Sequence, residues 1–213
     1  MAITYPLTSL PAAWRVARLR WTGRSNVAVP RSVFSFAAQA QDWGGQMWLA
    51  DVDFPPLGRA EAQGLVAWIR SLNGAYGTFL MGDPSRAAPL GSAAATPGTP
   101  VVDGAAQTGQ DLAIRGAPDS ATGYLLAGDL VQIDTGADAR LHEVLADVDT
   151  DGSGDATLTL WPSLRVSPAD GTALAVTACV GVFRAVNNDI FTDVAPGDDW
   201  RPPALQVAEA LEI

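Results

Sequence analysis

The chain has 213 residues, of which 48% are hydrophobic and 17% charged, and its formal net charge at pH 7 is −10. This composition excludes a disordered chain and supplies enough apolar side chains for one large domain or two small ones. The single cysteine, Cys179, excludes an internal disulfide and a CxxC metal site, and we interpret it as a buried, inert thiol.

The N-terminal sequence has no basic stretch followed by an apolar core, so we expect no signal peptide. No apolar run approaches the roughly 18 residues that a membrane-spanning helix needs. We therefore expect a soluble protein that is made in a cytoplasm.

The first part of the chain alternates mostly with period two, which is typical of strands. We predict strands over residues 14–22, 27–41 and 46–54, with Phe34 and Phe36 on one face of the second strand. In the third strand the apolar side chains of Trp48, Ala50, Val52 and Phe54 alternate with those of the other face.

Two short motifs should bound the third strand. Residues 42–45 (DWGG) are typical of a turn that closes a hairpin between the second and third strands. The pair Pro55-Pro56 should end the third strand, because proline has no N–H to donate to a β ladder.

One helix is predicted over residues 59–72, followed by a stop at Asn73-Gly74. We interpret its apolar stripe as core packing and not as a ligand site. A short buried strand over residues 77–83 should follow. The side chains of the stripe recur at i, i+3, i+4 and i+7, and they are Leu65, Trp68, Ile69 and Leu72.

The composition changes near residue 85. Residues 85–110 are nearly all Ala, Pro, Gly, Ser and Thr, which predicts a linker or extended arm. Residues 111–180 contain short strands at the spacing of small barrels and sandwiches. Strand character returns after Gly181, so we expect residues 181–213 to complete the domain that residues 1–84 begin.

The residues offer little support for catalysis. The one histidine, His142, stands beside Glu143 in a predicted strand, and no nucleophile motif accompanies it. We interpret it as a partly exposed strand residue. The chain has too few His and Cys ligands for zinc and no glycine-rich nucleotide loop, so we expect no cofactor.

Residues 149–155 (DTDGSGD) present oxygen atoms at positions 1, 3 and 5 and glycine at position 6, as a calcium-binding loop does. Position 12 holds Leu160 where such a loop needs an acid, and strands should flank it where helices are needed. A hairpin turn explains the same residues and is our preferred interpretation. The weaker calcium alternative would use Asp149, Asp151, Ser153 and Asp155.

The carboxylates also do not indicate an enzyme. Asp51 and Asp53 share one face of a predicted strand, which is typical of the wet side of a half-buried sheet. A polysaccharide or cell-wall hydrolase needs two positioned carboxylates, and its candidates, Asp149, Asp151 and Asp155, lie in the predicted turn. We therefore expect a protein without enzymatic activity.

The charge is unevenly distributed along the chain. Residues 1–41 contain five arginines and no acid, so they carry formally +5, and the remainder carries −15. Basic and acidic surfaces on one protein favour head-to-tail contacts between copies, which close into rings or extend as filaments. The alternative is that the arginine usage reflects GC-rich coding. The candidates for contacts between subunits are Arg15, Arg18, Arg20 and Arg24.

The order and spacing of six short sequences are similar to those of a known protein group. The sequences are VFSF (33–36), WGGQMW (43–48) leading to PP (55–56), the alanine-rich helix around Trp68, GTFLMGDP (77–84), GVFR (181–184) and QVAEAL (206–211). Together they resemble tail proteins of long-tailed bacteriophages and related prophages, particularly the distal-tail group. The resemblance covers residues 14–84 and 181–213.

The resemblance implies a mainly β protein: a tail-tube-like β-sandwich with one flanking helix and an inserted small β-barrel or sandwich. It further implies a virion protein whose six copies form a ring between the tail tube and the tail hub or tip. DNA would pass through the ring without specific binding, and an acidic chain suits such a channel.

An alternative function is a carbohydrate- or host-surface-binding module of the tail tip. In that case the block 111–180 would bind the glycan, with Tyr124 or Trp161 as the stacking platform. The competing interpretation of Trp161 is a core residue at the end of a strand.

Overall fold

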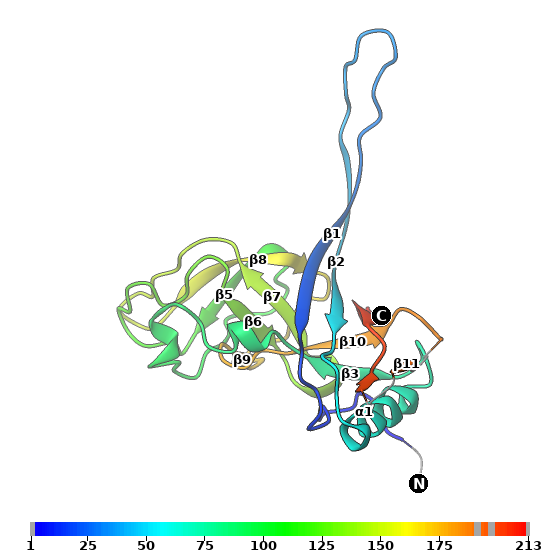
Figure 1. Ribbon diagram of the computed structural model, residues 1–213. Helices are drawn as coiled ribbons and strands as arrows, with labels where there is room; N and C mark the ends of the chain where they lie inside the picture. Colours follow the sequence, from blue (N-terminus) through cyan, green and yellow to red (C-terminus); the bar gives the residue numbers. More distant parts are fainter. Residues whose placement is uncertain (1–2, 190–192, 196–198, 212–213) are drawn as a thin grey trace.

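The computed structural model describes residues 3–189, 193–195 and 199–211. The protein is mainly β, with two principal sheets and one α-helix (Figure 1). The first sheet is antiparallel and has the strand order β1-β2-β13-β10-β3. Its strands are β1 (Arg18–Ala28), β2 (Gln41–Asp53), β3 (Thr78–Met81), β10 (Gly181–Ala185) and β13 (Leu205–Glu209).

The second sheet curls into a nearly closed barrel, which we call the barrel. Its strand order is β4-β5-β8-β7-β6-β9, and an isolated bridge between Val101 and Ala173 joins the two end strands. The strands are β4 (Val101–Val102), β5 (Gly109–Arg115), β6 (Leu130–Ile133), β7 (Arg140–Val144), β8 (Ala156–Leu164) and β9 (Leu174–Ala175).

The chain enters the barrel after β3 and returns at β10, two strands that are neighbours in the first sheet. Gly181 of β10 pairs directly with Met81 of β3. The smaller elements are the hairpin β11 (Asp193–Ala195) and β12 (Asp199–Arg201) and the 3-10 turns η1 (Pro84–Arg86), η2 (Ser92–Ala94) and η3 (Gly136–Asp138).

The helix α1 (Arg59–Ser71) packs under the first sheet, as its apolar stripe predicts. Its buried side chains include Leu65 and Ile69, and they join the core that Phe79 and Phe183 form on the sheet. Asn73 and Gly74 both adopt positive φ and end the helix, as expected from the sequence. Within the described residues, no helix is long and apolar enough to cross a membrane.

The predicted hairpin has the wrong boundaries. β1 extends to Ala28 and β2 begins at Gln41, so residues 29–40, expected within a strand, form the connecting loop. Residues 42–45, expected as the turn, lie inside β2. The alternation of the third predicted strand is confirmed, since Trp48, Ala50 and Val52 are buried.

The segment 85–110 is also not the extended arm that its composition suggests. It carries η2, β4 and the start of β5, and Ala93 and Val102 are fully buried in the core of the barrel. Small residues here permit close packing: a Cβ on Gly91 would lie 2.3 Å from the Tyr124 carbonyl oxygen. The segment therefore belongs to the barrel.

Candidate functional site

The most prominent feature of the surface is a two-stranded ribbon that projects from the body (Figure 1). β1 and β2 pair over their whole lengths, from Arg18 opposite Asp53 to Ala28 opposite Gln41. β13 pairs with β2 only over Leu49–Val52, opposite Leu205–Ala208. Residues 24–47, which we call the arm, therefore lie beyond the last pairing of β2 with β13.

A local turn closes the tip of the arm. The Ser32 hydroxyl accepts hydrogen bonds from the backbone N–H groups of Phe34 and Ser35, at 3.3 and 3.4 Å. The backbone N–H of Ser32 donates to the Ala37 carbonyl at 2.9 Å, and Phe36 adopts a positive φ of 56°. These bonds all lie within residues 32–37, so the tip closes through its own residues.

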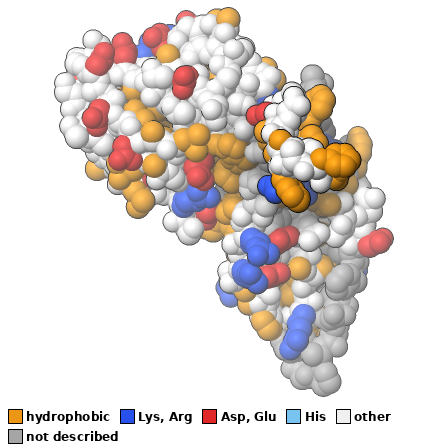
Figure 2. All heavy atoms as spheres, turned by 90° about the horizontal axis from the view of Figure 1, so that it is seen from above, with side chains coloured by type: hydrophobic (Ala, Val, Ile, Leu, Met, Phe, Trp, Pro, Cys, Tyr) orange, Lys and Arg blue, Asp and Glu red, His pale blue; other side chains and the backbone are white. Residues whose placement is uncertain are grey.

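The arm exposes large apolar side chains. Phe34 is 95% exposed, Val33 79%, Phe36 78% and Trp43 67%. Figure 2, which looks down on the molecule from above, shows apolar side chains gathered on the arm and acidic ones spread over the barrel. Concentrated apolar exposure of this kind marks interaction sites on proteins.

The foot of the arm is fixed by aromatic packing between the two sheets. The Trp48 ring packs edge to face against Trp161 of β8, with centroids 4.4 Å apart, and against Trp21 of β1 at 5.6 Å. The Trp48 indole N–H donates to the Leu141 carbonyl of β7 at 3.1 Å. A Cβ on Gly23 would lie only 2.6 Å from the Trp161 ring, so any larger residue here would displace that ring.

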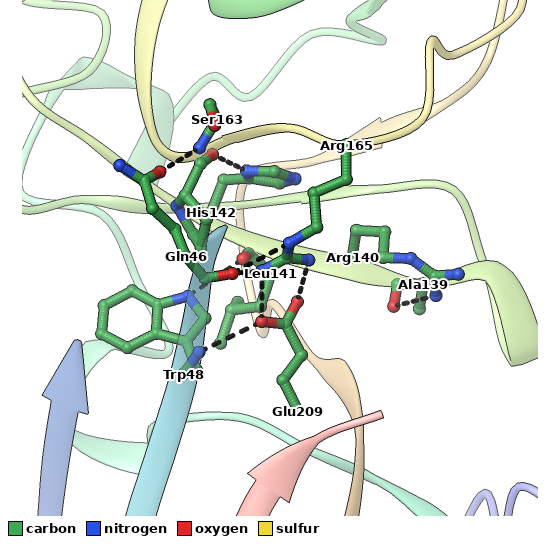
Figure 3. Close-up of polar contacts among 10 residues, drawn as sticks. Gln46, Trp48, Ala139, Arg140, Leu141, His142, Ser163, Arg165 and Glu209 are labelled. Atoms are coloured by element: carbon green, nitrogen blue, oxygen red, sulfur yellow. Dashed lines mark hydrogen bonds and ion pairs between the residues drawn. The ribbon is translucent and has the colours of Figure 1, made fainter. Parts of the chain in front are cut away.

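An ion pair adds to this junction (Figure 3). Arg165, just after β8, donates to both carboxylate oxygens of Glu209 at 2.9 and 2.7 Å and to the Gln46 carbonyl at 3.0 and 2.7 Å. Glu209 also accepts from the Trp48 backbone N–H at 3.1 Å. The Gln46 side chain in turn accepts from the Ser163 N–H at 2.7 Å. We call these contacts the latch.

His142 lies beside the latch and is only 3% exposed, which corrects the expectation of a partly exposed residue. Its Nδ1 donates to the Pro162 carbonyl at 2.7 Å. Burial lowers the pKa of the imidazole to about 4, because water no longer solvates the charged form. His142 is therefore neutral near pH 7 and serves as a packed donor.

The four arginines proposed for subunit contacts are all exposed. Arg18 and Arg20 lie on the outer face of β1, directly opposite Asp53 and Asp51 of β2. The two acids are therefore cross-strand neighbours of opposite charge. The structure thus places the basic side chains along the arm-bearing edge.

Arg24 and Arg15 occupy the two ends of this edge. Arg24 lies at the foot of the arm, beside a groove of about 450 Å³ that Met47, Arg165 and Leu211 also line. Arg15 contacts Glu61 of α1 at 3.4 Å. Both side chains remain accessible to a partner.

The two aromatic residues considered for glycan stacking are not free to stack. Tyr124 is fully buried in the barrel core, and its hydroxyl donates to the Pro97 carbonyl at 2.6 Å. Trp161 packs against Trp48 at the foot of the arm. The competing interpretation, a core residue at a strand end, is right about packing, but Trp161 is half-buried and lies within β8 and not at its end.

The acidic loop 149–155 forms a hydrogen-bonded turn. One Asp151 oxygen accepts from the N–H groups of Ser153 and Asp155, at 2.8 and 2.9 Å, and these bonds lower the pKa of Asp151. Asp149 accepts from the Gly123 N–H at 2.6 Å. Among the residues that the structure describes, no group of three or more His, Cys, Asp or Glu side chains could hold a metal ion.

Two features that define this site, the exposed tip of the arm and the latch, are not predicted by the sequence. The exposed tip was assigned to a strand because Phe34 and Phe36 alternate as a buried face does. Arg165 and Glu209 carried no local signal, since they are 44 residues apart in sequence. Comparison with models of known protein families and with curated proteins finds no match for this chain.

Proposed function

We propose that this chain is a structural, non-enzymatic component of a bacteriophage tail. In this proposal it forms a ring at the junction of tail tube and tail tip, around the DNA channel of the virion. Its partners are further copies of itself, six in a ring, together with the tail tube protein and the hub or tip proteins. The order of short sequences that resembles distal-tail proteins supports this assignment.

The observation that carries the proposal is the arm. Its apolar side chains are concentrated on a ribbon that reaches well beyond the body, where this chain cannot cover them. Burying one such side chain against a partner contributes about 1.5–3 kcal/mol. A second copy that receives the arm would bury several at once, so the arm is suited to assembly.

The charges favour contacts in which different surfaces meet. The arm contains Arg24 and Arg31, and residues 42–213 carry a formal excess of negative charge. An arm that docks on an acidic part of the next copy makes a head-to-tail contact, and repeated contacts of this kind close into a ring when the rotation permits. An acidic surface also forms few contacts with the phosphates of passing DNA.

Light scattering on the purified protein tests the proposal. We expect rings near six times 22.1 kDa, with an open centre in negative-stain images. The double substitution Phe34→Ser and Phe36→Ser should give monomers with unchanged unfolding behaviour, because both side chains are exposed. Leu90→Ser is the matched control, since Leu90 is 80% exposed on the barrel side and lies outside the arm.

A wild-type protein that stays monomeric at high concentration would contradict self-assembly through the arm. Rings that persist in the double variant would assign assembly to another surface. Rings lost in the Leu90→Ser control would indicate that general surface hydrophobicity, and not the arm, drives association.

A further inference from the structure

A cavity of about 220 Å³ lies where the first sheet meets the barrel, away from the arm. Several parts of the chain build it: the N-terminal segment, the turn after α1, the first residue of β3, the η3–β7 region of the barrel, β10, and the residue after β13. It therefore exists only when the barrel is docked on the first sheet. Its lining residues are Tyr5, Pro6, Tyr76, Thr78, Ala137, Arg140, Val182 and Ala210.

Arg140 differs from the other arginines of the barrel region. Arg86, Arg115 and Arg165 each contact a carboxylate at 2.6–2.9 Å. Arg140 has no carboxylate partner among the described residues. Its Nη1 donates to the carbonyls of Ala137 and Ala139, both at 3.3 Å, and these bonds orient the guanidinium away from Glu209 (Figure 3).

Two tyrosines also line the cavity. The rings of Tyr5 and Tyr76 meet edge to face, with centroids 6.0 Å apart. The Tyr5 hydroxyl donates to the Ser71 carbonyl at 2.6 Å and accepts from the Asn73 amide at 3.2 Å, so this ring is fixed. Tyr76 is 77% exposed and its ring is open to a ligand.

We propose that this cavity binds a sugar ring that carries a carboxylate. The free edge of the Arg140 guanidinium matches the two oxygens of a carboxylate. Arg140 is the one charged residue among the described residues that line the cavity, in a chain of net charge −10. The Tyr76 ring offers a flat apolar surface for the sugar. The cavity is smaller than the about 300–1,000 Å³ typical of drug-sized ligands, so it takes a single ring.

None of the cavity's lining residues belongs to the arm, so substitutions in the arm leave the site's own side chains unchanged. It also differs from the platform considered in the barrel core, since Tyr124 is buried and does not reach this cavity. The ligand class follows from the combination of one oriented guanidinium with one open aromatic ring. An anion alone would use the guanidinium, and a neutral sugar alone would use the ring.

The proposal is tested by titrating the protein with glucuronate, glucose and acetate. Isothermal calorimetry and protein NMR shifts measure the binding of each probe. We expect glucuronate to bind at least about tenfold more tightly than either other probe. Arg140→Gln should weaken glucuronate binding about tenfold and leave glucose unchanged. Tyr76→Ala should weaken glucuronate and glucose alike, and it should fold normally because Tyr76 is exposed. Arg115→Gln is the control and should bind as the wild type does.

Three results would overturn the proposal. The first is the absence of glucuronate binding at saturating concentration. The second is acetate that binds as tightly as glucuronate, which would make the site a simple anion or side-chain carboxylate site. The third is unchanged glucuronate binding in a folded Arg140→Gln variant. Ring formation in the same samples reports on assembly separately.

Discussion

Arg165 and Glu209 form a bidentate ion pair that joins the end of β8 in the barrel to β13 of the first sheet. The Glu209 side chain is only 2% exposed and that of Arg165 24%, so the pair is largely removed from water. Because Arg165 also binds the Gln46 carbonyl, β13, β2 and the end of β8 meet at one guanidinium. The direction of the arm is therefore fixed relative to both sheets.

We expect Arg165→Ala to destabilise the protein by about 3–5 kcal/mol, because the Glu209 carboxylate would stay buried without its partner. Urea unfolding measures this change. Arg115→Ala removes an exposed arginine that also contacts two carboxylates, Asp103 and Asp170, and it should cost far less. Equal losses of unfolding free energy in both variants would show that burial does not make the Arg165–Glu209 pair more important for stability.

Gly23→Ala should destabilise the protein by about 1–3 kcal/mol, because the new methyl group would collide with the Trp161 ring at the foot of the arm. Gly64→Ala is the matched substitution, since Gly64 lies on the exposed side of α1 with no atom within 4 Å of the new Cβ. It should stabilise by roughly 0.5–1 kcal/mol. Thermal or urea unfolding of the pair gives the signs, and a neutral Gly23→Ala would contradict the close packing.

Stability should fall as the pH decreases from about 6.5 toward 4. The folded protein holds the pKa of His142 at about 4, whereas the unfolded chain takes up the proton near 6.5. The unfolded state therefore binds more protons in this window, and about 2 kcal/mol should be lost between pH 7 and pH 5. His142→Gln keeps a donor for the Pro162 carbonyl and should flatten this profile.

The chain contains one histidine, so the assignment of this pH effect can be checked directly. The imidazole signals in NMR spectra of the folded protein should not move between pH 7 and pH 5. Titration near pH 6.5 in the folded state would show that the ring is solvated.

Cys179 should react with a thiol reagent such as Ellman's reagent only after unfolding. The thiol is buried, with its Sγ 3.2 Å from the carbonyl oxygens of Leu130 and Ala175. Burial raises the pKa of this thiol to about 12, so little thiolate is present near neutral pH. Rapid modification of the native protein would mean that the packing around Cys179 opens easily.

The parts of the fold that were predicted correctly depend on local pattern. α1 was located because four apolar side chains recur on one face, and the buried face of β2 because Trp48, Ala50 and Val52 alternate. Both signals arise within a single element that packs on one core. The exposed tip imitates such a signal, because Phe34 and Phe36 also alternate, and a period of two does not reveal whether a second layer is present.

The remaining features depend on contacts between distant residues. The segment 85–110 joins the barrel because Val102 pairs with Ile114 and packs in a shared core, which its composition does not indicate. Arg140 is a candidate ligand-binding residue because, unlike the other arginines of the barrel region, it contacts no carboxylate among the described residues. Its role follows from an unpaired charge, and pairing is a property of the folded molecule.

The latch determines when, during synthesis of the chain, the arm is fixed in its final direction. The arm itself is translated early, within the first 50 residues, whereas Glu209 belongs to β13, the last strand described. A nascent chain on the ribosome thus carries the apolar tip long before the contact that orients its foot can form. Only a polypeptide elongated through residue 209 presents the arm in its final direction, so incomplete products lack the geometry that assembly would need.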